Sequence, residues 1–187
     1  MKKLMLILAV IITACNPQVE KETIVTPEGA GFFLPAPGEK YVVASDEVTD
    51  VWMNYINAHN KRDLDAIMMM ESDSISIDAP DGTVIQGKEM HRAALDAWFA
   101  AENPMWEVYW AMPYKAVKNG AEWIIAGHQV TTTVDGKEKT ELHMIDGQIE
   151  DGKVKRFFVY TKDIPMPPLP KKEEKKVANS LVDAAGE

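Results

Sequence analysis

The chain has 187 residues, of which 46% are hydrophobic and 26% are charged, as in an ordinary globular protein rather than a disordered one. Its 20 Lys and Arg against 29 Asp and Glu give a formal net charge of -9. This acidity argues against binding along a nucleic-acid backbone, which needs a basic face. A single cysteine, Cys15, excludes an intrachain disulfide and any multi-cysteine zinc or iron–sulfur site. No Gly-rich loop followed by Lys-Ser or Lys-Thr is present, and we expect no cofactor.

Residues 1–14 are typical of a secretory signal peptide, because two lysines precede a short apolar run that ends in small residues. The run is shorter than the about 20 apolar residues that a permanent membrane span requires. Residues 12–15, Ile-Thr-Ala-Cys, resemble the lipobox of bacterial lipoproteins, in which the peptide is cut before a cysteine that then carries lipid. The resemblance implies a lipid anchor on Cys15 and a place in the bacterial cell envelope, at the outer membrane facing the periplasm. The alternative is an ordinary signal peptide with an incidental cysteine.

Two segments without a hydrophobic period flank the expected domain. Residues 15–40 are rich in Pro, Gly and charge, which predicts a flexible tether between the anchor and the domain. Residues 165–187 begin with a proline run and continue into a Lys/Glu run, which predicts a disordered tail. The folded domain is therefore expected at 41–164.

The first half of this domain has apolar residues at helical spacing in three segments. The expected helices cover 46–60, 63–70 and 88–101. Between the second and the third, two short segments at 74–78 and 83–85 read as strands, because a Pro-Asp-Gly turn joins them.

The second half reads as a meander of four strands. The expected strands cover 106–117, 121–134, 137–149 and 154–161. Asn-Gly and Asp-Gly pairs, which are two-residue hairpin signals, join the first three of these strands. Helices followed by antiparallel strands predict an α+β domain.

Tight turns fix which residues lie opposite each other and which share a face of the sheet. A two-residue turn at 135–136 places His128 opposite His143, and one at 119–120 places Ala111 opposite His128. One face then carries Tyr109, Ala111, Ile124, Ala126, His128, Val130, Glu141, His143 and Ile145. The other carries Trp106, Trp110, Met112, Tyr114, Trp123, Ile125, Leu142 and Met144. Both faces are apolar, so a sheet covered by helices on one side is expected to bury its other face in a homodimer.

The order of these elements resembles the superfamily of nuclear transport factor 2-like, SnoaL-like and ketosteroid-isomerase-like domains. Residues 55–67 (YINAHNKRDLDAI) are similar to its first helix junction, 77–87 (IDAPDGTVIQG) to its strand and Gly-bounded turn, and 151–160 (DGKVKRFFVY) to its final hairpin. The resemblance implies a cone-shaped curved antiparallel sheet with three N-terminal helices packed over its concave face, and a pocket between them. The implied pocket lining includes His128, Val130, His143, Ile145, Phe157 and Val159.

The resemblance also locates the groups that related enzymes use. The tyrosine of the steroid isomerases matches Tyr55, but their aspartate base matches Ala79, and their oxyanion acid falls near Ile145 or Met144. The last-strand aspartate of the epoxide hydrolases matches Val159. Because these acids are missing, the residues leave open whether the chain is an enzyme.

The expected ligand pocket consists of Tyr55, Trp98, Tyr109, His128, Val130, Glu141, His143, Ile145, Phe157 and Val159. Within it, His128 and His143 with Tyr55 are candidate acid–base residues, because histidine titrates near neutral pH. The two histidines and Glu141 could also form a two-histidine, one-carboxylate metal set. The simplest interpretation is that both histidines only line the pocket, and we assign no metal. His91 is interpreted as an edge histidine.

Three functions are compatible with these patterns. The leading hypothesis is a lipid-anchored SnoaL-like domain that binds a small, largely apolar ligand. The second is an isomerase, lyase or hydrolase type of enzyme that uses the same pocket. The third is a dimeric interaction module of the cell envelope, in which the outer sheet face or the proline-rich tail engages a partner.

Overall fold

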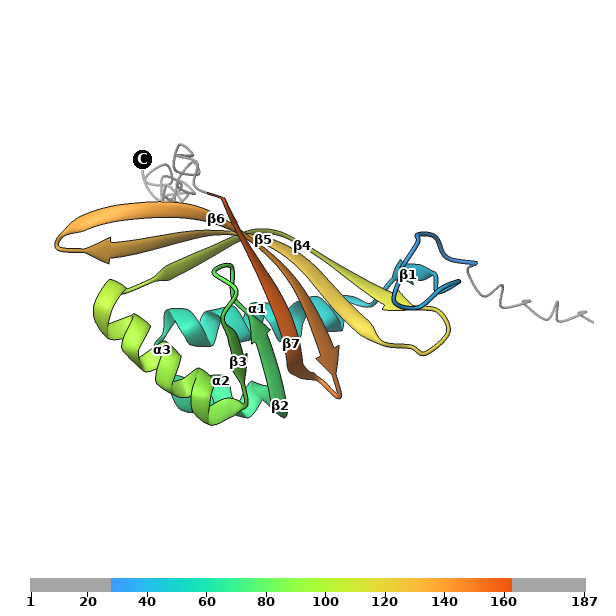
Figure 1. The fold of residues 1–187 in the computed structure, drawn as a ribbon, viewed down its shortest axis with the longest axis horizontal. Helices are drawn as coiled ribbons and strands as arrows, with labels where there is room; N and C mark the ends of the chain where they lie inside the picture. The colour runs from blue at the N-terminus through green and yellow to red at the C-terminus, as the bar shows by residue number, and fades with distance from the viewer. Residues whose placement is uncertain (1–27, 163–187) are drawn as a thin grey trace, which may run out of the picture.

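The computed structural model describes residues 28–162 (Figure 1). Three helices are present in this part of the chain: α1 (Asp46–Asn60), α2 (Leu64–Met70) and α3 (Lys88–Glu102). The seven strands are β1 (Tyr41–Val43), β2 (Glu71–Asp78), β3 (Val84–Gln86), β4 (Met105–Ala116), β5 (Glu122–Val134), β6 (Lys137–Glu150) and β7 (Lys153–Lys162). The expected signal peptide, Cys15 and the expected tail at 165–187 lie outside the described residues.

The helices begin where local signals place them. Ser45 precedes α1 in an extended conformation, and the first turn carries Asp46 and Glu47, whose charges suit the positive end of the helix dipole. The side chain of Asp63 caps α2 by accepting a hydrogen bond from the backbone N–H of Ala66 at 2.9 Å. All three helices were expected from the sequence, each within one residue of its observed ends. No helix in residues 28–162 is long and apolar enough to cross a membrane.

One seven-stranded sheet runs in the order β1-β4-β5-β6-β7-β2-β3 and does not close on itself. β2 pairs with β7 in parallel, so the sheet is mixed, and the expectation of a purely antiparallel sheet is corrected at this one pairing. β1 was not expected as a strand, and it pairs with the end of β4. The last residues of the expected tether contact the domain, because Glu39 is buried and accepts a hydrogen bond from the backbone of Lys118.

The register of β5 and β6 is the one that the turn at 135–136 predicts, with His128 opposite His143. Both turn residues, Asp135 and Gly136, have the positive φ angles that a tight hairpin needs.

The register of β4 and β5 was predicted wrongly, for two reasons. Ala116 hydrogen-bonds to Ala121, so four residues rather than two make this turn. That change alone shifts the register by two residues, and an even shift leaves every side chain on its expected face of the sheet. A β-bulge between Val108 and Trp110 then reverses the faces toward the start of β4, so that Val108 pairs with His128.

The bulge moves two aromatic residues relative to expectation. Tyr109 is the unpaired residue of the bulge and is 38% exposed, so the prediction that it lies in the pocket is wrong. Trp106, expected on the opposite face from His128, instead pairs with Val130 on the same face.

The three helices lie on one side of the curved sheet, as Figure 1 shows. The main core forms between them and the inner sheet face, where α1 contributes Trp52, Tyr55 and Ile56. Gly147 on β6 lies against this core, because a Cβ atom there would be in ordinary van der Waals contact with the ring of Trp52, at 3.5 Å. We refer to the covered side as the inner face and to the opposite side as the outer face.

Candidate functional site

A cavity of about 580 Å³ lies between the helices and the inner face. All four histidines of the sequence line it, and each comes from a different element: His59 from α1, His91 from α3, His128 from β5 and His143 from β6. Aromatic rings make up much of the remaining wall, namely Trp52, Tyr55, Trp98, Trp106 and Phe157. The cavity is therefore apolar with a few polar groups, which is the usual character of a small-molecule site.

A buried carboxylate, Glu71, joins two of these side chains. Glu71 is fully buried at the start of β2, and its Oε1 accepts hydrogen bonds from the Tyr55 hydroxyl and from Nδ1 of His91, each at 2.6 Å. Burial and the neighbouring carboxylate raise the pKa of Tyr55 well above its ordinary value, so the phenol keeps its proton. Because Nδ1 of His91 is engaged with Glu71, Nε2 is the nitrogen that remains to meet a ligand.

His128 is held as a neutral ring with a defined tautomer. Its Nε2 accepts a hydrogen bond from the indole N–H of Trp52 at 2.9 Å, so the proton lies on Nδ1. Burial lowers the pKa of His128 to about 4, although the backbone of His143 opposes the shift. Nδ1 is buried and has no hydrogen-bond partner within residues 28–162.

The other two histidines are also uncharged at neutral pH. Burial lowers the pKa of His59 to about 3, and its Nδ1 hydrogen-bonds the backbone oxygen of Tyr55 at 2.8 Å. Burial lowers the pKa of His143 as well, while Glu141, whose Oε2 is 3.3 Å from Nε2 of His143, opposes the shift. His59, His128 and His143 therefore present imidazoles without a positive charge to the cavity.

Most residues of the expected pocket line the cavity. They are Tyr55, Trp98, His128, Glu141, His143, Ile145, Phe157 and Val159. Val130 is buried on the inner face, but neither it nor Tyr109 is among the lining residues. A role in ligand binding or catalysis stays a prediction for all of them.

Sequence reasoning missed four groups at this site. His91 was interpreted as an edge histidine but is buried against Glu71. Glu71 was left outside the expected strand, and Glu102 and Trp106 were not assigned to the pocket. Glu71 could have been singled out by its position between an apolar helix and a strand. An acid that becomes buried at such a position needs hydrogen-bond donors close to it.

Within residues 28–162, no group of three or more His, Cys, Asp or Glu side chains is arranged to hold a metal ion. The two-histidine, one-carboxylate alternative that includes Glu141 therefore gains no support from the geometry. The positions that match the family's acids, Ala79, Ile145 and Val159, do line the cavity. They supply only apolar surface there.

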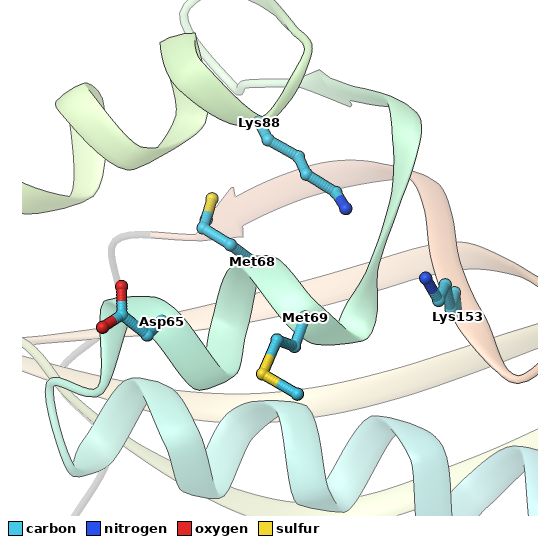
Figure 2. Close-up of a pocket in the computed structure, with 5 residues that line it drawn as sticks. All are labelled: Asp65, Met68, Met69, Lys88 and Lys153. Atoms are coloured by element: carbon cyan, nitrogen blue, oxygen red, sulfur yellow. The ribbon is translucent and has the colours of Figure 1, made fainter.

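A second hollow of about 520 Å³ lies on the surface beside α2, and Figure 2 shows its five lining residues. Two of its charged side chains pair with neighbours at the surface: Lys88 lies 2.7 Å from Asp73, and Asp65 lies 2.8 Å from Arg92. The methionines Met68 and Met69 form its apolar part. Because the hollow is open and holds no buried polar group, we treat the inner cavity as the candidate site.

No family model and no curated protein matches this sequence. Solved structures do share its fold. An LEH-like epoxide hydrolase from M. tuberculosis superposes with a TM-score of 0.55 at 12% identity, covering 63% of this chain and 84% of that one. A proposed polyketide cyclase from Xanthomonas campestris gives 0.51 at 13% identity, covering 62% and 90%. A proposed ketosteroid isomerase from Kribbella flavida gives 0.51 at 13% identity, covering 70% and 88%.

These neighbours are SnoaL-like and ketosteroid-isomerase-like proteins with the nuclear transport factor 2-like fold. The fold of this chain is the same cone-shaped α+β arrangement. At such low identity the similarity shows the fold alone, and the function must be argued from the cavity.

Proposed function

We propose that this domain binds a small, largely apolar molecule in the inner cavity. The supporting observation is the wall of aromatic rings that lines the cavity, Trp52, Tyr55, Trp98, Trp106 and Phe157. Ligand pockets commonly have volumes of roughly 300–1,000 Å³ and combine an apolar wall with a few polar groups. The cavity has about 580 Å³ and matches this description.

Two neighbouring alanines on α3 provide a test. Ala94 lines the cavity and Ala93 does not, while both residues are exposed. We expect Ala94→Trp to block the cavity and to lower binding of the uncharged probe N-phenyl-1-naphthylamine at least about fivefold, and Ala93→Trp to leave binding unchanged. Probe fluorescence with the purified full chain measures this, and thermal unfolding checks both folds. Unchanged binding in Ala94→Trp would place the probe elsewhere.

A second candidate is an enzyme in which His91 acts as a general base. The observation that favours it is the hydrogen-bonded chain of Tyr55, Glu71 and His91, in which the carboxylate orients the imidazole. This differs from the sequence-based assignment to His128 and His143, because His128 has a pKa of about 4 and accepts a hydrogen bond from Trp52.

The probe 5-nitrobenzisoxazole tests for such a base. A base takes its ring proton while the nitrogen–oxygen bond opens, and a coloured cyanophenolate forms. We expect His91→Gln to abolish the acceleration, because glutamine can still bond to Glu71 but takes up no proton. His143→Ala is expected to keep most of it. Equal rates in wild type and His91→Gln would refute the assignment.

We also propose that a lipid on Cys15 holds the domain in the bacterial cell envelope, at the outer membrane facing the periplasm. The signal-like segment at 1–14 and the lipobox-like residues at 12–15 support this. An acidic protein gains nothing from an anionic membrane surface, so a lipid would have to supply the attachment. Cys15→Ser is expected to lose both fatty-acid labelling and membrane fractionation, and a variant that kept them would refute the anchor.

The outer face supports a proposal of homodimerisation. It exposes Trp110, Met112, Met144 and Tyr160, which are 41%, 50%, 41% and 52% exposed. An apolar patch of this kind is typical of an interface. Sedimentation of the full chain is expected to give a dimer, and Trp110→Glu a monomer. A monomeric wild type would refute the proposal.

A further inference from the structure

We propose that the ligand of the inner cavity is an organic ammonium ion, whose charged end lies against Trp98, Trp106 and Glu102. This inference rests on the proposed function, because it assumes that the cavity takes a small molecule. Beyond the proposed function, the inference specifies that the small molecule is positively charged and where in the cavity its charge lies.

The charges around the cavity favour a cation. Among the described residues 28–162, no Lys or Arg lines it, whereas the carboxylates of Asp81, Glu102 and Glu141 do. Burial depresses the pKa of His59 and of His128 to about 3 and about 4, so these two imidazoles add no positive charge at neutral pH. His91 and His143 each face a carboxylate of the protein, Glu71 and Glu141. An anionic ligand would therefore lose its hydration without gaining a cationic partner, which is costly.

Glu102 is the carboxylate best placed to attract the positive charge of the ligand. Its Oε2 accepts a hydrogen bond from the indole N–H of Trp98 at 2.8 Å, so its position is fixed by an uncharged donor. Within residues 28–162, Glu102 forms no ion pair, whereas Glu141 is paired with Lys139 at 2.5 Å. Glu102 is also the last residue of α3, where the partial negative charge of the helix dipole adds to its own.

Two indole rings meet beside this carboxylate. Trp98 and Trp106 lie at 89° to each other with their centroids 5.2 Å apart, and both line the cavity. Aromatic faces attract organic cations through their quadrupole, and tryptophan does so most strongly. At this corner, a cation can contact aromatic surface next to a negative charge. The apolar part of the ligand can then extend toward Phe157 and Ile145.

Arg62 is a positive group near this corner, and it is directed elsewhere. Its guanidinium lies 4.8 Å from the centroid of the Phe99 ring and donates to Asn103 at 2.7 Å. It does not line the cavity. Its charge is therefore engaged outside the space that the ligand would fill.

Three compounds of similar size isolate the effect of charge. The cation is benzyl(2-hydroxyethyl)dimethylammonium, its uncharged carbon isostere is 3,3-dimethyl-4-phenylbutan-1-ol, and the anion is 4-phenylbutyrate. Titration of the full chain, followed by tryptophan fluorescence and calorimetry, is expected to show the cation binding about tenfold more tightly than the isostere, with the anion weakest. Equal or tighter binding of the isostere or the anion would overturn the inference. Binding of the isostere alone would still support the proposed function.

Two isosteric variants on α3 locate the charge. Glu102→Gln keeps an acceptor for Trp98 but removes the negative charge, and is expected to weaken cation binding about fivefold while binding of the isostere stays within about twofold. Asp96→Asn makes the same change in net charge at an exposed residue that does not line the cavity, and is expected to change neither affinity. If both variants weakened cation binding equally, only overall charge would matter, and the assignment to this corner would be wrong.

Discussion

The two faces of the sheet have similar apolar content but different surroundings. On the inner face, Trp52 is 1% exposed and hydrogen-bonded to His128. On the outer face, Trp110 is 41% exposed, and its indole lies across Gly127, where a Cβ atom would collide with it. Helices cover only one face, so the same residue type is core on one side and surface on the other. Apolar composition alone does not identify the side that forms a site.

The sharpest test of this difference is the same substitution on both faces. Trp52→Ala is expected to lower the free energy of unfolding by about 3–5 kcal/mol, because it opens a large hole in the core and leaves His128 without its donor. Trp110→Ala is expected to cost less than about 1 kcal/mol within one protomer. Urea denaturation measures both at a protein concentration where the chain is monomeric. Similar losses for the two variants would contradict the contrast.

The buried histidines make the covered side of the domain sensitive to mildly acidic pH. His59 and His128 have pKa values of about 3 and about 4 in the folded protein against an ordinary 6.5, so below pH 6.5 the unfolded chain binds protons that the folded chain does not. Stability is therefore full above pH 6.5 and falls as the pH drops, by about 1.4 kcal/mol per pH unit for each residue.

Denaturation at pH 7, 6 and 5 checks this slope. His128→Gln keeps an acceptor for Trp52 but has no titrating ring, and it is expected to reduce the slope by about 1.4 kcal/mol per pH unit. A variant slope equal to that of the wild type would mean that His128 is not held neutral in the fold.

The buried carboxylate provides a smaller test. Tyr55→Phe removes one of the two donors to Oε1 of Glu71 and is expected to destabilise the fold by about 1–3 kcal/mol, because Oε2 already has no partner within residues 28–162. Tyr160→Phe on the outer face, where the residue is 52% exposed, is the matched control and is expected to have no effect. Thermal unfolding of both variants measures the difference. No loss in Tyr55→Phe would show that His91 alone satisfies Glu71.

The smallest expected effect compares two glycines of adjacent strands. Gly127→Ala must push aside the exposed indole of Trp110, which costs about 1 kcal/mol and changes the tryptophan emission. At Gly147 a Cβ atom would lie 3.4 Å from Ile124 and 3.4 Å from Phe157, so Gly147→Ala is expected to stay within about 0.5 kcal/mol of wild type. An unchanged emission spectrum in Gly127→Ala would show that the indole does not rest on that strand.

The sequence predicted what local chemistry controls. Helical spacing identified α1, α2 and α3, and the Asp135-Gly136 turn gave the pairing of His128 with His143. The bulge at Tyr109 could not be predicted, because the pairing of two long strands depends on how the whole sheet bends. Because of this one extra residue, Trp106 lies on the inner face, where Tyr109 was expected.

The missed part of the site depends on contacts between distant residues. Glu71 and His91 are 20 residues apart and come from β2 and α3, so no spacing rule connects them. Glu102 and Trp106 line the cavity from the end of α3 and the start of β4, so the helix end and the displaced strand both had to be known. Residue types suggested an apolar pocket with histidines and Glu141, but Glu71 and Glu102 required the three-dimensional arrangement.

The hydrogen bond between Trp52 and His128 also constrains when the cavity can form. Its two residues are 76 positions apart, and α1 is made long before β5. Contacts of such long range form slowly, because a large loop must close before they gain any energy. During synthesis, the apolar side of α1 therefore stays exposed to solvent until most of the sheet has been made. We therefore expect the cavity to be completed late in folding. A chaperone would bind before that, while α1 is still exposed.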